Sequence, residues 1–375
     1  MRRRNNSKKK IALISGIVLF LIISVVIFFK IYSFYNNIYT KKSPNIQIKT
    51  PVEKTAYNIL LMGYGGAGHE GAYLTDTMMV AHVDTKTKKA TLISIPRDIW
   101  VKVPTDSGDS FHSKINAVYQ MGLFPKNYPD IPKKYHGEQG AGELVGLIIK
   151  QVTGLTVDNY VAIDFTGFEK TVNTLGGIDV PVAVTFDDPE YPLTGHEADL
   201  CGKPESDLPE LEKIATDSPE IAFPCRYETL HFDAGIQHMD GATALKFVRS
   251  RHSAQDGGDF ARARRQQLFL EALKSEIISL DFIPKIIPLM DDLADHIQTD
   301  IDPVFANKLL LGSQVGNEYT QRQFVLDDDQ YIRTSYSEYG QFILIPKAGI
   351  DKWNSVHVGL QNFIEGVSAT PRKVK

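Results

Sequence analysis

Residues 58–98 read NILLMGYGGAGHEGAYLTDTMMVAHVDTKTKKATLISIPRD, and this stretch predicts the sheet around which the chain folds. Its first part, Asn58–Gly63, is an apolar run that ends at a glycine, which is typical of a buried strand. Two further runs, Thr77–Asp84 and Lys89–Asp98, enclose a polar turn and predict a β-hairpin. The loop between the first strand and this hairpin, Gly63–Asp76, is rich in glycine, but it lacks Gly-Lys-Ser/Thr and precedes a strand. It is therefore not a P-loop.

Strands and helices alternate through the following residues. Gly142–Gly154 has apolar residues at helical spacing and a glycine stop, and Asn159–Phe165 reads as the next strand. Val103–Ser113 reads as a polar loop. The alternation predicts an α/β fold, a layered domain with a central mixed β-sheet flanked by helices. Further elements are expected at Lys114–Gly122 (helix start), 166–177 (helix), 178–184 (strand) and Ala242–Phe247 (helix).

The length and charge of the chain restrict its class. Its 375 residues have room for one large or two medium domains. Six of the 41 Lys and Arg lie in the first ten residues, so 41 − 6 = 35 face 45 Asp and Glu in the remainder. A main domain this acidic does not resemble a nucleic-acid binder, and no nucleic-acid partner is expected.

The N-terminus predicts a membrane anchor. Ile11–Phe29 carries no charge and is about long enough to cross a bilayer, after a basic tail at residues 1–10. Because basic flanks stay in the cytoplasm, the main domain is expected outside a cell membrane spanned once. Residues 30–56 then form an extracellular stalk. A cleaved signal peptide is the alternative, but no small-residue cleavage site follows.

The chain contains two cysteines, Cys201 and Cys225, and both follow the predicted anchor. An even count in an oxidising compartment indicates a disulfide, which would stabilise the fold by roughly 3 kcal/mol in the chain-entropy model. The alternative is a pair of free thiols in a cytosolic protein, and the anchor argues against it. The surrounding residues, Asp187–Glu228, are rich in Pro, Asp and Glu and read as a long surface excursion.

Arginines concentrate in the stretch from Val248 to Gln267, which reads VRSRHSAQDGGDFARARRQQ. Arg249 and Arg251 stand two residues apart before a glycine-containing turn. Asp259 is a plausible N-cap for the helix that follows. A loop and a helix start therefore present arginines together.

On that predicted helix, Arg262 and Arg265 share a face, Gln266 joins them, and Arg264 points elsewhere. Guanidinium groups present a planar fork of donors that suits a phosphate or pyrophosphate. The stretch is thus interpreted as an anion site. The alternative is a set of surface arginines paired with the few local acids.

Several motifs occur in the order found in one known family: LTDTMMVAHVD, TLISIPRD, KINAVYQMG, YVAIDFTGFEKTVNTLGGIDV, MDGATALKFVRSRH and DFARARRQQ. Together they resemble the LytR–CpsA–Psr family of cell-envelope proteins, over roughly Tyr57 to Leu280. The resemblance implies a catalytic domain at residues 57–300, an extension of unknown role at 301–375, and transfer of a glycan phosphate from a polyprenyl-pyrophosphate carrier onto peptidoglycan. Membrane lipid is the third implied partner.

The resemblance also implies roles for individual residues. Asp76 would bind Mg²⁺ (or Mn²⁺) and, with Arg97, Arg249 and Arg251, take part in catalysis. The predicted pyrophosphate-binding set is Arg97, Lys114, Arg249, Arg251, Arg262, Arg265 and Gln266. The general base stays open between Asp76 and Asp98.

One loop departs from the family pattern, because no second metal aspartate and no arginine or lysine stand in Gly63–Asp76. His69 or Glu70 could replace the missing metal ligand, and the alternative is that both are solvated loop residues. A groove for the polyprenyl tail is expected beside the arginines. Its walls could come from Gly142–Gly154 and Asn159–Phe165, unless these residues are ordinary core.

Three functions remain open from the sequence. The first is the glycan phosphotransferase. The second is a non-catalytic protein that binds the polyprenyl-pyrophosphate lipid or a wall polymer, which the altered loop supports. The third is a pyrophosphatase that uses water in place of the glycan acceptor.

Overall fold

A mixed sheet of six strands lies at the centre of the part of the chain that the computed structural model describes, residues 29–39, 54–69, 71–278, 280–302, 305 and 319–366. Its strand order is β11-β6-β1-β2-β3-β12. The strands are β1 (Ala56–Tyr64), β2 (Thr75–Asp84), β3 (Lys89–Ser94), β6 (Asn159–Asp164), β11 (Ile297–Thr299) and β12 (Thr320–Val325).

The pairing of these strands confirms the predicted hairpin. β1 runs antiparallel to β2, and β2 runs antiparallel to β3. β6 is parallel to β1 and β12 is parallel to β3, so the sheet is mixed as expected. Leu60 on β1, Val80 on β2 and Ile93 on β3 have no exposed surface, because the sheet is covered on both faces.

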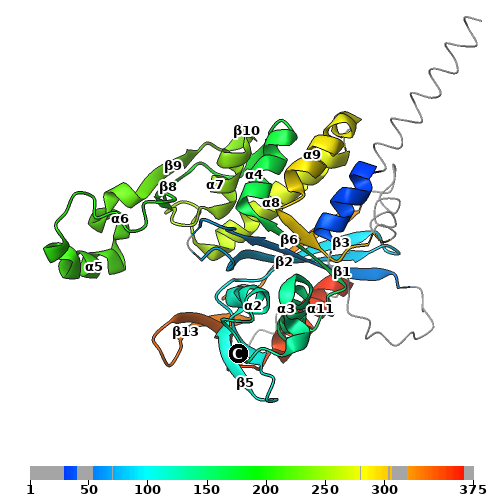
Figure 1. Ribbon diagram of the computed structural model, residues 1–375, viewed down its shortest axis with the longest axis horizontal. Helices are drawn as coiled ribbons and strands as arrows, with labels where there is room; N and C mark the ends of the chain where they lie inside the picture. Colours follow the sequence, from blue (N-terminus) through cyan, green and yellow to red (C-terminus); the bar gives the residue numbers. More distant parts are fainter. Residues whose placement is uncertain are drawn as a thin grey trace, which may run out of the picture.

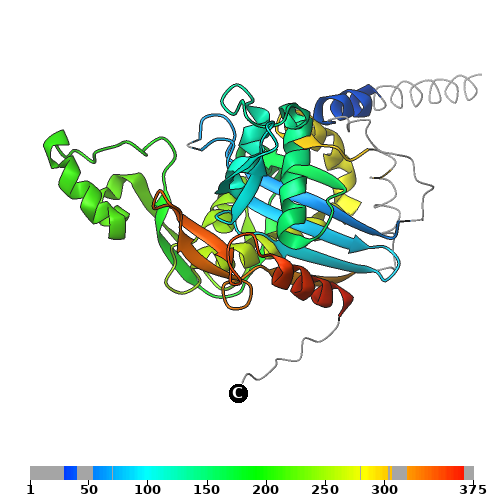
Figure 2. The ribbon, with the colours of Figure 1, turned by 90° about the horizontal axis from the view of Figure 1, so that it is seen from below.

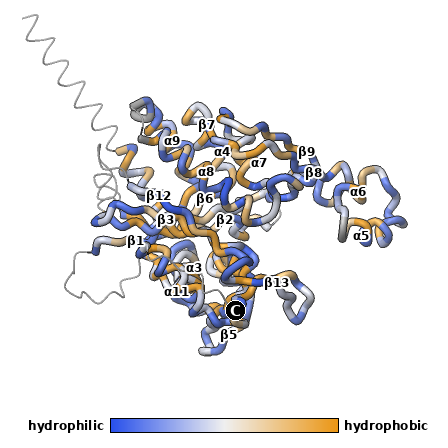
Figure 3. The backbone as a smooth tube through the Cα atoms, turned by 180° about the vertical axis from the view of Figure 1, so that it is seen from behind, coloured by the Kyte–Doolittle hydropathy of each residue, from blue (hydrophilic) through white to orange (hydrophobic). Residues whose placement is uncertain are grey.

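Helices cover the two faces of the sheet (Figure 1). Apolar residues gather between the sheet and these helices (Figure 3), which gives two cores on opposite sides of the strands. The layers confirm the predicted α/β fold class. One layer holds α2 (Val118–Leu123), α3 (Gly137–Thr153) and α11 (Asn354–Glu365), and the other holds α4 (Phe165–Thr174), α7 (Gly241–Arg249), α8 (Gly258–Ile278) and α9 (Ile286–Leu293).

Two elements differ from the sequence-based prediction. α3 begins at Gly137, earlier than expected, and ends at Gly154, whose φ of 77° is the left-handed conformation that stops a helix. The prediction of a polar loop at Val103–Ser113 is wrong, because β4 (Trp100–Pro104) and β5 (Ser110–Lys114) form a hairpin there. Alternate valines of β4 are fully buried, and their contribution to the core outweighs the polar composition of the turn.

The C-terminal residues extend the main domain. β12 lies at the edge of the central sheet, and α11 packs on α3. β13 (Ile332–Tyr336) and β14 (Phe342–Pro346) form an antiparallel pair in the same part of the chain.

An arm projects from the body between β7 (Ile178–Val182) and β10 (Gly235–Met239) (Figure 2). Its stem is the antiparallel pair β8 (Phe186–Pro192) and β9 (Tyr227–Phe232). Its tip carries the short helices α5 (Leu208–Asp217) and α6 (Pro219–Ala222). The tip has its own small apolar cluster of Leu211, Ala222 and Phe223.

The sulfur atoms of Cys201 and Cys225 lie within disulfide-bonding distance at the root of this tip. We expect the double substitution Cys201→Ser and Cys225→Ser to destabilise the tip by about 3 kcal/mol. A disulfide that closes a loop with a sequence separation of 24 restricts the unfolded chain, and the small apolar cluster of the tip offers little other stabilisation. Limited proteolysis would measure this as early cleavage between β8 and β9. Equal cleavage rates for the variant and the wild-type chain would contradict the presence of a disulfide.

The N-terminal prediction is only partly covered. Residues 29–38 are helical, and most of the predicted anchor, Ile11–Phe29, lies outside the described residues. Among the helices that the structure does describe, none has the length and hydropathy needed to span a membrane.

Candidate functional site

Four chain segments meet at one edge of the central sheet. Because β2 runs antiparallel to both β1 and β3, the start of β2 lies beside the ends of its two neighbours. The end of β6 reaches the same edge, since β6 is parallel to β1. Asp76 is the second residue of β2, Arg97 follows β3, and Phe165 begins α4. The strand order therefore brings the glycine-rich loop and the predicted site residues together.

A cavity of about 620 Å³ lies between this edge, the start of α8 and the stem of the arm. It gathers five of the seven predicted pyrophosphate ligands, four of them arginines. Its lining also contains four carboxylates and several aromatic side chains. The chemistry-bearing residues are Arg97, Arg249, Arg251, Arg262, Gln266, Asp76, Thr77, Asp188, Glu190, Glu197, His69, His252, Phe165, Tyr191 and Tyr227.

Arg97 is held by carboxylates on both sides. Nη1 of Arg97 donates to Oδ1 of Asp76 over 2.6 Å, and Nε of Arg97 lies 3.5 Å from Oδ2 of Asp98. Burial alone would lower the pKa of Arg97, but the two carboxylates outweigh burial and raise it. Arg97 thus stays charged and fixed in direction at the wall of the cavity.

Arg262 is the most deeply buried arginine of the cavity, with 7% of its surface exposed. Its Nη2 lies 2.9 Å from Oδ1 of Asp259, one turn earlier on α8. Burial, followed by the charges of Arg97 and Arg251, lowers the pKa of Arg262 to about 10. The guanidinium is still protonated at neutral pH, so the fold holds a cation where the surroundings disfavour one. An anion in the cavity would relieve this repulsion.

Gln266 follows Arg262 by one helical turn and ties α8 to the sheet. Its Nε2 donates to Oγ1 of Thr77 on β2 over 2.8 Å and to the carbonyl of Val248 over 3.2 Å. The amide thus fixes the α8 start against both β2 and the α7 end. The predicted grouping of Arg262 with Gln266 is present in the structure.

Arg249 and Arg251 enter the cavity from the end of α7 and the loop after it. Nη1 of Arg249 donates to the hydroxyl of Tyr191 over 2.9 Å, and its guanidinium lies 4.3 Å from the ring centre of Phe165. Burial and the charge of Arg97 lower the pKa of Arg251. Both arginines are therefore partly desolvated before any ligand binds.

Asp188 fixes this loop, and the sequence analysis did not single it out. It has no exposed surface, and its Oδ2 accepts from Oγ of Ser250 (2.6 Å) and from the backbone N–H groups of Arg251 (2.8 Å) and His252 (3.1 Å). Burial would raise the pKa of Asp188, but these hydrogen bonds outweigh it and lower the pKa. One aspartate in an acidic surface excursion gives no sequence signal for such a role.

The prediction that Arg265 points to the same place as Arg262 is wrong. Arg265 is 2% exposed and does not line the cavity. It donates to Oδ2 of Asp256 over 2.8 Å and to the carbonyls of Phe247, Ser250 and Asp256. The free carbonyls at the C-terminal end of α7 attract a cation, and they take this guanidinium away from the cavity. Arg265 holds the loop that presents Arg251.

Four other residues considered from the sequence lie in different places. Lys114 pairs with Oδ1 of Asp98 over 2.6 Å and is not part of the cavity lining. Glu70 lies outside the described residues, whereas His69 lines the cavity with its ring 5.4 Å from that of Phe165. Arg264 points elsewhere, as expected, and pairs with Asp256 over 3.0 Å.

The fit of a divalent metal depends on Asp76. Within the described residues, the group of three neighbouring metal-competent side chains is Asp199, Cys201 and Cys225, and its two sulfurs lie at bonding distance from each other. The cavity has no comparable three-ligand cluster among those residues. Mg²⁺ is often held by one or two carboxylates together with substrate phosphates, so Asp76 beside the arginines fits a site that the substrate completes.

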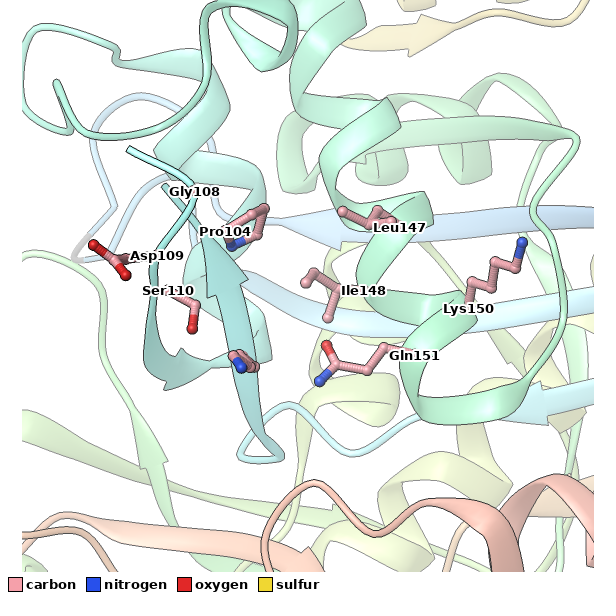
Figure 4. A pocket seen from close by; sticks show the side chains of 9 residues that line it. Pro104, Gly108, Asp109, Ser110, Leu147, Ile148, Lys150 and Gln151 are labelled. Carbon is pink, nitrogen blue, oxygen red and sulfur yellow. The ribbon is translucent and has the colours of Figure 1, made fainter. Parts of the chain in front are cut away.

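The residues predicted to wall a lipid groove lie only in part at this cavity. Leu144, Ile148 and Val152 of α3 belong to the hydrophobic core, so the alternative reading as core holds for that helix. A second hollow of about 560 Å³ lies at α3 and the β4–β5 hairpin, where Leu147 faces Pro104 (Figure 4), and it contains none of the predicted site residues. Phe165, the last residue of the second predicted wall, does line the cavity. The apolar surface beside the arginines comes from Leu74, Phe165, Tyr191, Pro192, Pro219 and Tyr227.

Known proteins resemble the chain in sequence. It is 29% identical over 253 residues to the polyisoprenyl-teichoic acid–peptidoglycan teichoic acid transferase TagV of Bacillus subtilis strain 168, a match that covers 67% of this chain and 51% of TagV. It is 27% identical to TagU of Oceanobacillus iheyensis, over 67% of this chain and 60% of TagU. The matched part of the chain thus spans little more than half the length of these relatives.

Solved structures share the fold. The crystal structure of B. subtilis TagV matches with a TM-score of 0.54 at 24% identity and covers 84% of this chain and 99% of that one. Protein gbs0355 from Streptococcus agalactiae matches with a TM-score of 0.55 at 20% identity, over 83% and 87%. The LytR_cpsA_psr family model matches residues 25–332, most of the chain, and the resemblance seen in the motifs is thereby confirmed: this protein belongs to the LytR_cpsA_psr family.

Proposed function

We propose that this protein is a membrane-anchored extracellular phosphotransferase, which moves a glycan phosphate from a polyprenyl-pyrophosphate carrier onto peptidoglycan. The observation that carries the proposal is the gathering of four arginines and Gln266 around one cavity, where burial and the charge of Arg97 disfavour the charges of Arg251 and Arg262. A pyrophosphate would offer these guanidinium donors several charged acceptor oxygens at one place. The names of the relatives TagV and TagU support the same reaction class.

The arginines would bind the non-bridging oxygens of the two phosphates. Phosphoryl transfer needs little covalent help from the protein, and depends on neutralised charge and on reactants held in line. Asp76 and Asp98 hold Arg97, and Asp259 of α8 holds Arg262. Their donors are therefore oriented before the substrate binds. Such preorganised donors stabilise charge as it develops on the phosphate oxygens.

A divalent cation, Mg²⁺ or Mn²⁺, would bind at Asp76 together with the substrate phosphates. When bound, it would neutralise part of the pyrophosphate charge. Because Oδ1 of Asp76 accepts from Arg97, the arginine holds the carboxylate in place at the cavity wall.

The carrier lipid would lie against the apolar side chains of the cavity. Phe165 and Tyr191 contact Arg249, and Tyr227 lines the same cavity, so a polar head and an apolar chain would have adjacent surfaces. The predicted anchor at Ile11–Phe29, with the N-terminus in the cytoplasm, would keep this cavity close to the membrane that holds the lipid.

The test uses the full-length chain in detergent with a short-chain polyprenyl-pyrophosphate glycan and peptidoglycan fragments, with and without Mg²⁺. We expect release of polyprenyl phosphate that requires both the acceptor and Mg²⁺, and a fall of at least about 10²-fold in Arg251→Ala, since a donor to the reacting phosphate is lost. Arg333→Ala is the matched control, because Arg333 is exposed on β13 and outside the cavity.

Two results would replace the proposal by an alternative. Release at full rate without any acceptor identifies a pyrophosphatase. Tight binding of the lipid with no release under any condition identifies a binding protein. Asp76 is the one described carboxylate of the cavity with a predicted metal role, and a weak metal site would fit that outcome.

A further inference from the structure

His252 lines the same cavity and is coupled to two neighbours that define its chemistry. Its Nδ1 lies 2.8 Å from Oε2 of Glu190 on β8. Its Nε2 lies 2.9 Å from Nε of Arg251. The imidazole is 38% exposed, so it is open to the cavity while held at both ring nitrogens.

The two contacts fix which nitrogen carries the proton. A guanidinium has only donors, so Nε2 of His252 must accept from Arg251. Nδ1 of the neutral ring then carries the hydrogen and donates it to the carboxylate of Glu190. An imidazole oriented by a carboxylate, with its other nitrogen unprotonated and the ring at the wall of a cavity, is the arrangement that enzymes use to take a proton from a hydroxyl.

The two aspartates considered from the sequence are less suited to this task. Asp76 accepts from Arg97 over 2.6 Å. Asp98 accepts from Lys114 over 2.6 Å and does not line the cavity. Asp76 is also the proposed ligand of the divalent cation, and Asp98 lies outside the cavity, whereas the partner of Nε2 in His252 is an arginine that a bound pyrophosphate would engage.

We propose that His252 is the general base of the transfer and that Glu190 is the residue that positions it. This inference rests on the proposed function. The acceptor O–H gives its proton to Nε2 of His252 as its oxygen forms a bond to the glycan-bearing phosphorus. The bond between that phosphorus and the bridging oxygen breaks, and the electron pair leaves with polyprenyl monophosphate. His252 then carries the proton, which it returns to solvent.

Charged groups from several elements surround His252. Glu190 and Asp188 approach from β8, and Arg251 approaches from its own loop. Arg249 and Glu197 line the same cavity.

The test compares His252→Gln with His231→Gln in the full-length chain. The glutamine oxygen at 252 can still accept from Arg251, so the positioning of the arginine is kept while the base is lost. His231 is the matched control, because it also faces a carboxylate, Asp187 at 2.7 Å, but stands exposed outside the cavity. We expect kcat of His252→Gln to fall about 10²- to 10⁴-fold, with Kd for the lipid pyrophosphate within twofold of wild type.

The pH profile gives a second readout. Wild-type kcat is expected to fall on the acidic side as His252 becomes protonated, and this limb should be absent in His252→Gln. Glu190→Gln should keep lipid binding and lower kcat less than the His252 change does, because it removes only the orienting carboxylate.

Three results would overturn the inference. A His252→Gln chain with wild-type kcat shows that another group takes the proton, and the proposed transfer itself would still stand. A variant that loses activity only through weaker lipid binding shows that His252 merely places Arg251. A wild-type chain that binds the lipid but transfers nothing overturns both this inference and the proposed function.

Discussion

Replacing Arg262 with methionine is expected to lower the transfer rate by about 10²- to 10³-fold, because a preorganised donor to the reacting phosphates is lost. The stability of the folded chain should change little, within about 1 kcal/mol, since methionine fills a similar volume and removes a desolvated charge. Arg262 is 7% exposed, and burial, Arg97 and Arg251 all disfavour its charge, whereas its ion pair with Asp259 favours it. Asp259 keeps 27% of its side chain exposed, so water can take the place of the lost guanidinium. Under the proposed function, the charge of Arg262 serves the ligand.

The measurement combines initial rates with thermal unfolding in the presence and absence of inorganic pyrophosphate. Pyrophosphate should raise the Tm of the wild-type chain and raise that of Arg262→Met much less, because ligand that binds the native state stabilises it by mass action. Arg264→Met is the control, since Arg264 is exposed on the same helix and outside the cavity. An Arg262→Met chain with wild-type rate and pyrophosphate response would refute the anion site.

The same substitution three residues later is expected to have the opposite result. Arg265→Met should lower the free energy of unfolding by about 3 kcal/mol, because removal of one partner of a buried ion pair leaves the other without compensation. Arg265 is 2% exposed and satisfies Asp256 and the carbonyls of Phe247 and Ser250. Arg264 stays beside Asp256, which keeps the loss from being larger.

Chemical denaturation of the full-length chain would measure this loss, with Arg264→Met again as the control. At a temperature where Arg265→Met is folded, its affinity for pyrophosphate should fall far less than that of Arg262→Met. A variant of normal stability that fails to bind pyrophosphate would show that Arg265 is a ligand after all, as the sequence analysis expected.

The sequence determined much of the fold because its signals are local. The apolar run of Asn58–Gly63 and the two runs of the hairpin appear as paired strands, and Gly154 ends α3 through its positive φ. The β4–β5 hairpin was missed because its polar turn dominates the composition, while burial of Val101 and Val103 is a property of the packed domain. Strand pairing across the chain, such as β12 on β3, has no local signal at all.

For the site, the sequence by itself determined the family and predicted a cluster of arginines and working residues at the ends of strands. The tertiary structure alone decided which arginines share a cavity. Helical spacing gives Arg262 and Arg265 the same face, but the carbonyls at the end of α7 attract one guanidinium and leave the other in the cavity. Only the folded arm brings Asp188 and Glu190 to residues 250–252, since a contact across some sixty residues depends on where the chain returns.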